Sequence, residues 1–266
     1  MIFTDKVCWV TGASSGIGEA IVYQLATKGA KLVISARRLD ELEKVKIKCA
    51  ELGNKNVQVV AIDLSDQESI SAAFRAVKNV HQRVDYLFNN GGLSQRGLVS
   101  DSESIEADRK IMEVNFFGTI ALTKKVLTLM LNNGFGHFVV TSSIVGKFGF
   151  PLRSTYSASK HALHGYFESL AIENFNNNIS VSMVLPGRIA TSLSLGALNA
   201  EGKVHGEMDE GLAAGMDVNE CAKQIVKGVA LKKREILVGG KEIMMVHFRR
   251  FVPALFYKLA ARIKPT

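Results

Sequence analysis

Short apolar segments alternate with helical segments along almost the whole chain. The apolar segments are rich in Val, Ile and Leu and contain few polar residues, unlike strands that have one face in water. Such strands must be covered on both faces, and a parallel sheet with helical connections covers them in this way. Right-handed connections then place helices on both sides of the sheet. The pattern therefore predicts an α/β fold, a three-layer, doubly wound parallel sheet of about seven strands.

The boundaries of these segments follow from hydrophobic periodicity and from turn residues. Strands are predicted at 6–11, 31–36, 57–62, 86–89, 137–141, 179–185 and 235–238. Helices are predicted at 16–28, 39–52, 67–81, 103–131, 154–176 and 219–231. The glycine-containing segment at about 192–216 has weak periodicity, so we expect a mobile lid over substrate there. We expect a single domain over 1–240 and a C-terminal extension over 241–266.

Composition limits the class of protein. With 266 residues, 47% of them hydrophobic, the chain has enough apolar material for the core of one domain. Its three cysteines are far apart in sequence, which disfavours a disulfide framework and a cysteine metal cluster. His161 and His164 share a predicted helix, but no third ligand has supporting spacing, so we predict no metal site. The N-terminus enters the first strand directly, so we expect a cytoplasmic protein without a signal peptide or membrane-spanning helix.

The net charge of +8 is concentrated partly in the extension. One acidic residue there, Glu242, stands against six basic residues: Lys241, Arg249, Arg250, Lys258, Arg262 and Lys264. Apolar and aromatic residues alternate with these charges, as in a basic amphipathic helix, so we predict no nucleic-acid partner. Three roles stay open for residues 243–263: contact with another subunit or the substrate, peripheral docking on a membrane, and packing onto the chain's own domain.

A glycine-rich turn, Thr11-Gly-Ala-Ser-Ser-Gly-Ile-Gly18, connects the first predicted strand to the first predicted helix. Glycine permits a tight turn and a close approach of the backbone to a ligand, and the helix N-terminus offers free N–H groups to a pyrophosphate. Because the turn follows a strand and opens a helix, it predicts a dinucleotide site. The turn residues expected to contact the cofactor are Gly12, Ser14, Ser15, Gly16, Ile17 and Gly18.

Arg37 and Arg38 follow the second predicted strand, where a protein that binds NAD usually has an acidic residue for the ribose hydroxyl. An arginine fork matches a 2′-phosphate instead. Asp40 and Glu41 suit the first turn of the next helix through its dipole. We therefore expect NADP(H) rather than NAD(H), and the choice between the two arginines stays open.

Tyr156 and Lys160 are four residues apart on a predicted helix, and Ser143 lies thirteen residues before the tyrosine. A phenol is a poor acid at neutral pH, with a pKa of ~10. Residues i and i+4 share a helix face, so the Lys160 ammonium can lie beside the phenol and favour its ionised form. The pair is one way to build a proton donor and acceptor for an alcohol or a carbonyl.

Together these motifs resemble those of the short-chain dehydrogenase/reductase family in its compact form, over residues 6–240. The family's Asn-Asn-Ala-Gly stretch appears as Asn89-Asn-Gly-Gly92, and its proline–glycine turn appears as Pro186-Gly187. The stretches 89–98 and 158–163 resemble, more narrowly, the subgroup of dehydrogenase/reductase member seven and the 11β-hydroxysteroid dehydrogenases. That resemblance implies a lipophilic ketone or aldehyde as the substrate.

The resemblance also assigns roles to individual residues. It implies that Asn115 holds a proton-relay water, that Ser143 binds the substrate oxygen and that Tyr156 transfers the proton. Lys160 would lower the pKa of the phenol and bind the nicotinamide ribose. Outside the glycine-rich turn and the two arginines, the implied cofactor contacts are Asp63, Leu64, Asn89, Gly91, Tyr156, Lys160, Pro186, Gly187, Ile189 and Thr191.

The predicted function is hydride transfer between NADP(H) and a carbonyl or alcohol, carried out in a doubly wound (Rossmann) domain. The family resemblance implies a homodimer or homotetramer that assembles through the helices at 103–131 and 154–176. The alternative from another class is a non-catalytic NADP(H)-binding protein that senses redox state. A complete set of Asn115, Ser143, Tyr156 and Lys160 favours the enzyme, since a sensor needs no proton relay.

Overall fold

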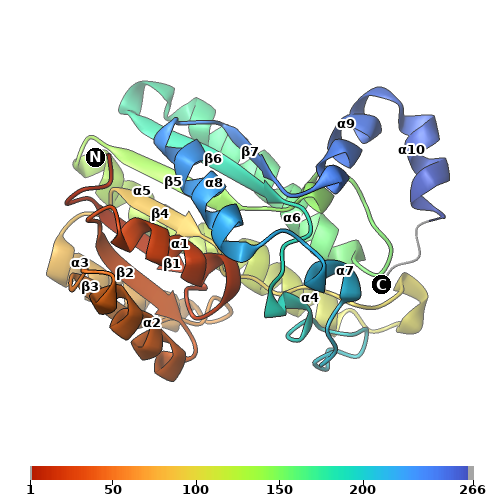
Figure 1. Ribbon diagram of the computed structural model, residues 1–266, viewed down its shortest axis with the longest axis horizontal. Helices are drawn as coiled ribbons and strands as arrows, with labels where there is room; N and C mark the ends of the chain where they lie inside the picture. The colour runs from red at the N-terminus through yellow and green to blue at the C-terminus, as the bar shows by residue number, and fades with distance from the viewer. Residues whose placement is uncertain (1, 263–266) are drawn as a thin grey trace.

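Within residues 2–262, which the computed structural model describes, seven parallel strands form one sheet (Figure 1). Their order is β3-β2-β1-β4-β5-β6-β7. The strands are β1 (Val7–Thr11), β2 (Lys31–Ala36), β3 (Val57–Ala61), β4 (Tyr86–Asn89), β5 (Gly136–Thr141), β6 (Ile179–Pro186) and β7 (Glu235–Val238). This order is that of the Rossmann fold, so the predicted α/β class and doubly wound parallel sheet are confirmed.

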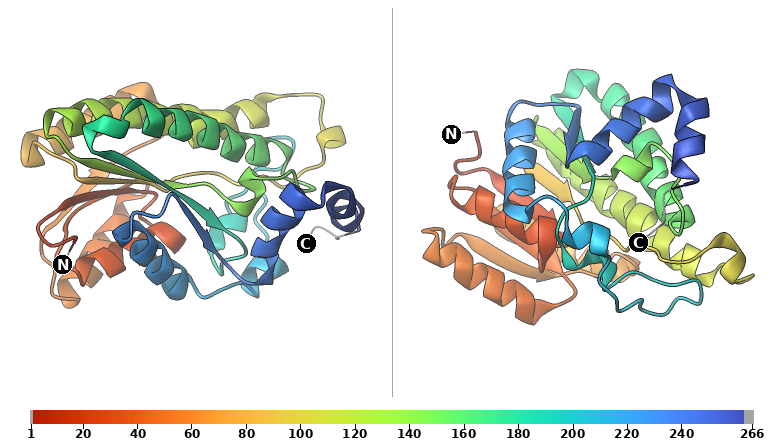
Figure 2. Two further views of the ribbon diagram at one scale, coloured as in Figure 1. Left: turned by 90° about the horizontal axis from the view of Figure 1, so that it is seen from above. Right: turned by 45° about the vertical axis from the view of Figure 1, so that its right-hand side comes forward.

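Helices cover both faces of the sheet. Before the C-terminal extension they are α1 (Gly16–Ala26), α2 (Leu39–Glu51), α3 (Gln67–His81), α4 (Glu106–Met112), α5 (Gly118–Asn132), α6 (Ser154–Glu173), α7 (Glu210–Ala213) and α8 (Val218–Ala230). On one face α1 packs between α2 and α8, and on the other α3 packs against α5 and α4 against α6. The view from above in Figure 2 shows these two helical layers with the sheet between them.

Strand β1 shows why the apolar segments are continuous. Val7 and Trp9 belong to the core under α3, α5 and α6, whereas Cys8 and Val10 belong to the core under α1, α2 and α8. Each of the four is at most 2% exposed. Successive side chains of a strand point to opposite faces, so a strand between two helical layers needs apolar residues at every position.

The sheet reverses its winding between β1 and β4, which pair directly. From β1 the chain builds outward to β3, and from β4 it builds outward to β7. The connections after these two strands therefore leave toward opposite faces and open a crevice at their carboxyl ends, where ligands of such sheets bind. The glycine-rich turn follows β1 and the Asn89-Asn-Gly-Gly92 stretch follows β4, so both reach this crevice.

The helix predicted at 103–131 begins three residues later and is interrupted. A π-helical segment, Glu113–Phe117, separates α4 from α5. Single π-helical turns inside α-helices are frequent at functional sites. By length and composition alone the stretch Glu106–Asn132 could cross a membrane. Its contacts with α3 and α6 place its apolar face against the protein core instead.

The C-terminal extension forms two short helices, α9 (Met244–Phe251) and α10 (Pro253–Ala260), rather than one continuous amphipathic helix. Pro253 lacks a backbone N–H and occupies the first turn of α10, where that loss costs least. Phe256 is 1% exposed, and its ring lies 5.2 Å from the ring of Phe148. One face of the extension thus packs onto the domain, at one end of the molecule (Figure 1). Residues 263–266 of the extension lie outside the described residues.

Candidate active site

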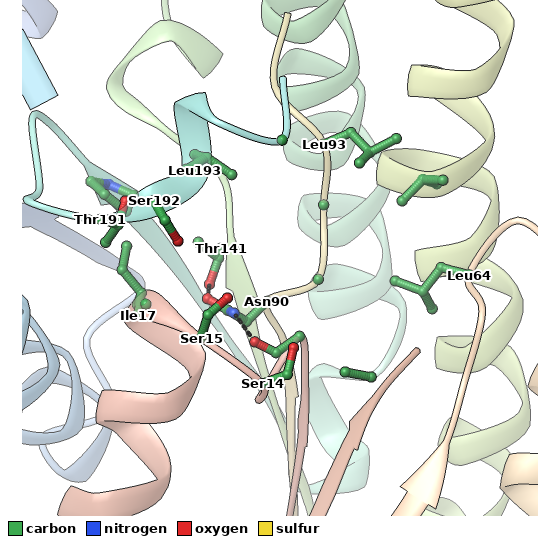
Figure 3. A pocket seen from close by; sticks show the side chains of 18 of the residues that line it. Ser14, Ser15, Ile17, Leu64, Asn90, Leu93, Thr141, Thr191, Ser192 and Leu193 are labelled. Atoms are coloured by element: carbon green, nitrogen blue, oxygen red, sulfur yellow. Dashed lines mark hydrogen bonds between the residues drawn. The ribbon is translucent and has the colours of Figure 1, made fainter. Parts of the chain in front are cut away.

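A cavity of about 600 Å³ lies at the carboxyl ends of the central strands. Figure 3 shows side chains from several separate segments turned toward it, among them Ser14, Asn90 and Thr191. The residues anticipated from the sequence that line it are Gly12, Ser14, Ser15, Gly16, Ile17, Arg37, Arg38, Asp63, Leu64, Gly91, Ser143, Tyr156, Lys160, Pro186, Gly187, Ile189 and Thr191. Three others anticipated from the sequence, Gly18, Asn89 and Asn115, are not among its lining residues.

The glycine-rich turn has the close backbone packing that a bound diphosphate requires. Gly12 has a φ of +64° and Gly16 a φ of +59°, in the left-handed region that favours glycine. A Cβ on Gly12 would lie 2.7 Å from the Cα of Gly91. A Cβ on Gly18 would lie 2.3 Å from the carbonyl oxygen of Gly12, so Gly18 serves helix packing and not ligand contact. The N-terminus of α1 therefore opens directly onto the cavity.

Arg38 lies across the glycine-rich turn. Its Nη2 donates to the hydroxyl oxygens of Ser14 and Ser15, each at 3.1 Å. A guanidinium and two hydroxyls thus meet at the edge of the cavity, and Arg37 lines the same cavity. These groups are donors that suit a phosphate.

Asp63, two residues after the end of β3, also lines the cavity. Burial alone would raise the pKa of its carboxyl, but hydrogen bonds from Ser65 and the charge of Arg37 hold that pKa below its usual value. The Ser65 hydroxyl donates to Oδ1 of Asp63 at 2.7 Å, and the Ser65 N–H at 2.9 Å. The carboxylate is therefore ionised and held in place.

Asn90, and not Asn89, presents its side chain to the cavity. Asn89 is buried and its Nδ2 donates to the hydroxyl of Thr123 on α5 at 3.0 Å. The Thr141 hydroxyl at the end of β5 donates to Oδ1 of Asn90 at 3.2 Å, as the dashed line in Figure 3 marks. The structure thus places Asn90, the residue after β4, at the cavity wall, and the cofactor contact expected for Asn89 stays a prediction.

Tyr156 and Ser143 lie between the large cavity and a second cavity of about 150 Å³, because both residues line both. Burial raises the pKa of the Tyr156 phenol, while a hydrogen bond with Ser143 and the charges of Arg153 and Arg96 act in the opposite direction. The neighbouring Ser142 is turned toward α6, where its hydroxyl donates to the carbonyl oxygen of Lys160 at 3.1 Å. Of the two serines, Ser143 is therefore the one beside the phenol.

Lys160 is buried next to Tyr156. Its Nζ donates to the carbonyl oxygen of Thr141 at 2.8 Å and lies 5.7 Å from the centroid of the Tyr156 ring. Burial lowers the pKa of this ammonium to about 8. The charges that oppose the rise in the pKa of the phenol are those of Arg153 and Arg96, so the structure does not assign to Lys160 the effect expected from the sequence.

Asn115 lies in the π-helical segment between α4 and α5, and its side chain holds the loop after β4. Its Oδ1 accepts from the N–H of Leu93 at 2.7 Å, and its Nδ2 donates to the carbonyl oxygen of Leu93 at 2.9 Å. Nδ2 also donates to the hydroxyl of Ser159 at 3.0 Å. The side chain therefore fixes the loop against α6, and the relay water stays a prediction.

The small cavity contains a buried charge cluster that the sequence did not indicate. Asp209, at the start of α7, accepts through Oδ2 from Arg96 at 2.8 Å and from Arg153 at 2.7 Å. Asp209 belongs to the segment 192–216, Arg96 to the loop after β4, and Arg153 is the residue before α6. Between Arg96 and Asp209 the separation is 113 residues, so no local pattern could have paired them.

Gln95 is a second feature that sequence reasoning missed. It is 5% exposed, and its Oε1 accepts from the N–H groups of Thr155 at 2.8 Å and Tyr156 at 3.2 Å. Its Nε2 donates to Asp108 at 3.4 Å. The side chain thus satisfies the first N–H groups of α6, the helix that carries Tyr156.

One group of side chains has the geometry of metal ligands, although none was predicted from the sequence. His164, Glu168 and Glu235 bring ligand atoms within 4.8 Å of one another. Glu235 is already paired with Lys147 at 2.5 Å, and the two glutamates are exposed. Lys147 thus supplies a positive charge to one of the two carboxylates, that of Glu235.

Comparison with known proteins identifies relatives over nearly the whole chain. A family model described as short chain dehydrogenase matches residues 6–201. Dehydrogenase/reductase SDR family protein 7-like of Anopheles gambiae is 42% identical over 258 residues, which cover 95% of this chain and 81% of that protein. Dehydrogenase/reductase SDR family member 7B of Mus musculus is 39% identical over 261 residues, covering 97% of this chain and 80% of that protein.

Solved structures share the fold. A short-chain dehydrogenase/reductase from Burkholderia phymatum in complex with NAD has a TM-score of 0.83 and 22% identity, over 100% of this chain and 98% of that chain. An alcohol dehydrogenase from the archaeon Thermococcus sibiricus, complexed with 5-hydroxy-NADP, has a TM-score of 0.75 and 28% identity, over 89% of this chain and 97% of that chain. With the family model and the close relatives, these matches show that the chain belongs to the short-chain dehydrogenase/reductase family of oxidoreductases.

Proposed function

We propose that this protein interconverts an alcohol and a carbonyl compound with NADP(H), and that Tyr156 is its acid and base. The observation that carries the proposal is the position of Tyr156 and Ser143 between the two cavities. The large cavity is big enough for a dinucleotide and is lined by the glycine-rich turn, so we assign it to the cofactor. The small cavity is then assigned to the substrate. When bound, the cofactor supplies the hydride chemistry, and the protein supplies orientation and proton transfer.

The two hydroxyls have complementary tasks at the substrate oxygen. Ser143 donates a hydrogen bond to the oxygen, and Tyr156 gives it a proton or takes one away. Both are buried, so these interactions act in a site with little water, where charges are weakly screened. Lys160, anchored on the Thr141 carbonyl, would contact the ribose beside the nicotinamide.

Replacement of Tyr156 by Phe tests this assignment. The hydroxyl is lost and the ring is kept, so NADPH binding should be unchanged while kcat falls by at least about 100-fold. The measurements are fluorescence titration with NADPH and turnover on a panel of ketones and aldehydes. Turnover close to that of the wild type would refute the role of Tyr156. If the wild type binds NADPH and turns over no carbonyl in the panel, the alternative of a redox-sensing binding protein gains support.

NADP(H) is preferred in this proposal because Arg38, Ser14 and Ser15 form a group of donors at the edge of the cavity. The solved relatives were determined with NAD or with 5-hydroxy-NADP, so they support a nicotinamide cofactor in general. Arg38→Gln should weaken NADPH binding by about tenfold, since a charge-assisted hydrogen bond is lost, and should leave NADH binding nearly unchanged. Equal losses for both cofactors would contradict a 2′-phosphate site at Arg38.

A lipophilic substrate is proposed from the walls of the small cavity. Its apolar lining residues are Ile144, Val145, Phe148, Phe150, Leu193, Leu212 and Met245. Leu193 and Leu212 belong to the lid at 192–216, which we propose closes over the bound substrate. We expect kcat/KM to rise with the apolar surface of the substrate, because the walls of the small cavity are apolar. A panel that includes steroids, retinal and short ketones would measure this dependence.

The outer face of the extension suits the surface of an anionic membrane. Phe251 is 72% exposed and Tyr257 59%, and Arg249 and Arg250 lie beside these two rings. Exposed aromatic rings among basic side chains bind the interface of anionic bilayers. We propose that this face makes peripheral contact with a membrane in an otherwise cytoplasmic protein. Flotation with phosphatidylserine vesicles should recover the wild type, and the double variant Phe251→Ser/Tyr257→Ser should not float.

We also propose that the protein associates with itself through α5 and α6. Light scattering would report the mass of the oligomer.

A further inference from the structure

The charge cluster of Arg96, Asp209 and Arg153 has one positive charge in excess. Both arginines bond the same carboxylate oxygen, and the side chains of Arg96 and Asp209 are each 4% exposed, that of Arg153 13%. Among the residues that the structure describes, Arg96 pairs with no second carboxylate, and its Nη1 donates to the hydroxyl of Ser94 and to the carbonyl oxygen of Gln95. A buried unbalanced charge is costly, so a protein that keeps one needs a counter-charge nearby.

Tyr156 is the group beside this cluster that can become negative. It lines the same small cavity as all three members of the cluster. Arg153 is the residue immediately before α6, three positions before Tyr156, and its side chain lines the same small cavity as the phenol. Two buried charges attract strongly, because little water screens them.

The other charged groups around the phenol do not balance the cluster. Arg188 and Glu242 also line the small cavity. The guanidinium of Arg188 is positive like the cluster, and Oε1 of Glu242 accepts from the backbone N–H groups of Arg188 at 2.8 Å and Gly240 at 3.0 Å. Lys160 is also positive; its Nζ lies 5.7 Å from the centroid of the Tyr156 ring and donates to the carbonyl oxygen of Thr141. Asp108, from α4, is bonded to the side chains of Thr155 and Gln95 and forms no ion pair with Arg96 or Arg153, which both pair with Asp209.

We propose that the cluster of Arg96, Asp209 and Arg153 is the counter-charge of the Tyr156 phenolate, so that its net charge sets the pH at which the phenol ionises. The cluster residues act through Tyr156 and are positioning residues, not catalytic ones. The direction of the pKa effects agrees with this, because burial raises the pKa of the phenol and both arginines oppose the rise. The relevance of this effect to turnover rests on the proposed function.

Two substitutions with opposite expected signs test the proposal. Arg153→Gln reduces the net charge of the cluster to zero, so the pKa of the phenol should rise by about one unit. Asp209→Asn keeps an oxygen acceptor but increases the net charge, so the pKa should fall by a similar amount. A merely structural role would not shift the pKa in opposite directions.

The measurement is the ultraviolet absorbance of tyrosinate as a function of pH. Each variant is compared with the same variant carrying Tyr156→Phe, so that the difference reports Tyr156 alone among the five tyrosines. Arg153→Lys keeps the charge and should titrate like the wild type. Arg75→Gln removes an exposed arginine from α3 and controls for total charge. No turnover is required, so a protein without reductase activity would overturn the proposed function and leave this test valid.

Unchanged titration in both variants, or shifts of the same sign, would overturn the proposal. A raised KM without a shift in the pKa would do so as well, since it would place the arginines in substrate binding. If Asp209→Asn fails to fold, as circular dichroism would show, Arg96→Gln replaces it. That variant must raise the pKa as Arg153→Gln does, and failure to raise it counts against the proposal.

Discussion

Gly12 and Gly91 face each other at the floor of the large cavity, yet they tolerate a side chain differently. Gly12 has a left-handed φ of +64°, and a Cβ there would meet the backbone of Gly91 at 2.7 Å. A Cβ on Gly91 would meet the Cδ1 atom of Leu64 at 2.8 Å, which is the end of a flexible side chain. Backbone cannot move aside at low cost, whereas a leucine can change rotamer.

We expect Gly12→Ala to weaken NADPH binding by at least about tenfold, because left-handed strain and the clash both displace the turn. Gly91→Ala should change binding by less than about threefold. Fluorescence titration with NADPH measures both, and thermal unfolding shows that each variant is folded. Equal effects at the two positions would mean that the backbone contact does not shape the cofactor site.

The N-terminus of α6 is held by Gln95, a residue outside the helix. Gln95 accepts hydrogen bonds from the N–H groups of Thr155 and Tyr156, and it is buried in the loop after β4. Buried N–H groups left without an acceptor cost free energy. The same side chain therefore stabilises the helix and fixes the start of the segment that carries the phenol.

Gln95→Leu should lower the free energy of unfolding by about 1–3 kcal/mol and reduce kcat more than it raises KM. Gln95→Glu keeps an oxygen acceptor at a helix N-terminus, where a negative charge is favoured, but it sets a second carboxylate against Asp108. It is therefore made together with Asp108→Asn, and the loss in this double variant should be smaller. Denaturant unfolding and steady-state kinetics measure the two effects. If both variants lose equally, the acceptor oxygen is not the reason for the role of Gln95.

Across the whole molecule, two buried histidines make the stability depend on pH. Burial lowers the pKa of His137 and of His164 from 6.5 to about 4. Below pH 6.5 the unfolded chain binds protons at these sites and the folded chain does not, down to about pH 4. The contribution of the two neutral histidines to the free energy of unfolding is therefore complete above pH 6.5 and is lost as the pH falls toward 4.

For each histidine the free energy of unfolding falls by about 3 kcal/mol, because each unit of difference between the unfolded and folded pKa corresponds to 1.36 kcal/mol. His137→Gln keeps a polar partner for the hydroxyl of Ser182, which now contacts Nε2 of His137 at 2.9 Å. We expect this variant to show a shallower fall in unfolding free energy between pH 6.5 and 4. Urea unfolding at several pH values gives the slope, and a slope identical to that of the wild type would contradict a neutral His137.

The features predicted correctly from the sequence depend on neighbouring residues. Continuous apolar segments indicated strands such as β1, because a strand covered on both faces has no polar position. The glycine-rich turn indicated the large cavity, because its left-handed residues must be glycine. The spacing of Tyr156 and Lys160 placed both side chains at this cavity, because α6 repeats every 3.6 residues.

What the tertiary structure decided depends on contacts between distant segments. At the end of β4 a change of one position exchanges the faces of the strand, so Asn90 and not Asn89 reaches the cavity. The partners Arg96 and Asp209 are separated by 113 residues in sequence, and they meet only because the segment 192–216 packs against the loop after β4. Local periodicity specifies the elements of this fold, but the surroundings of the phenol are formed by loops, whose contacts no repeat in the chain describes.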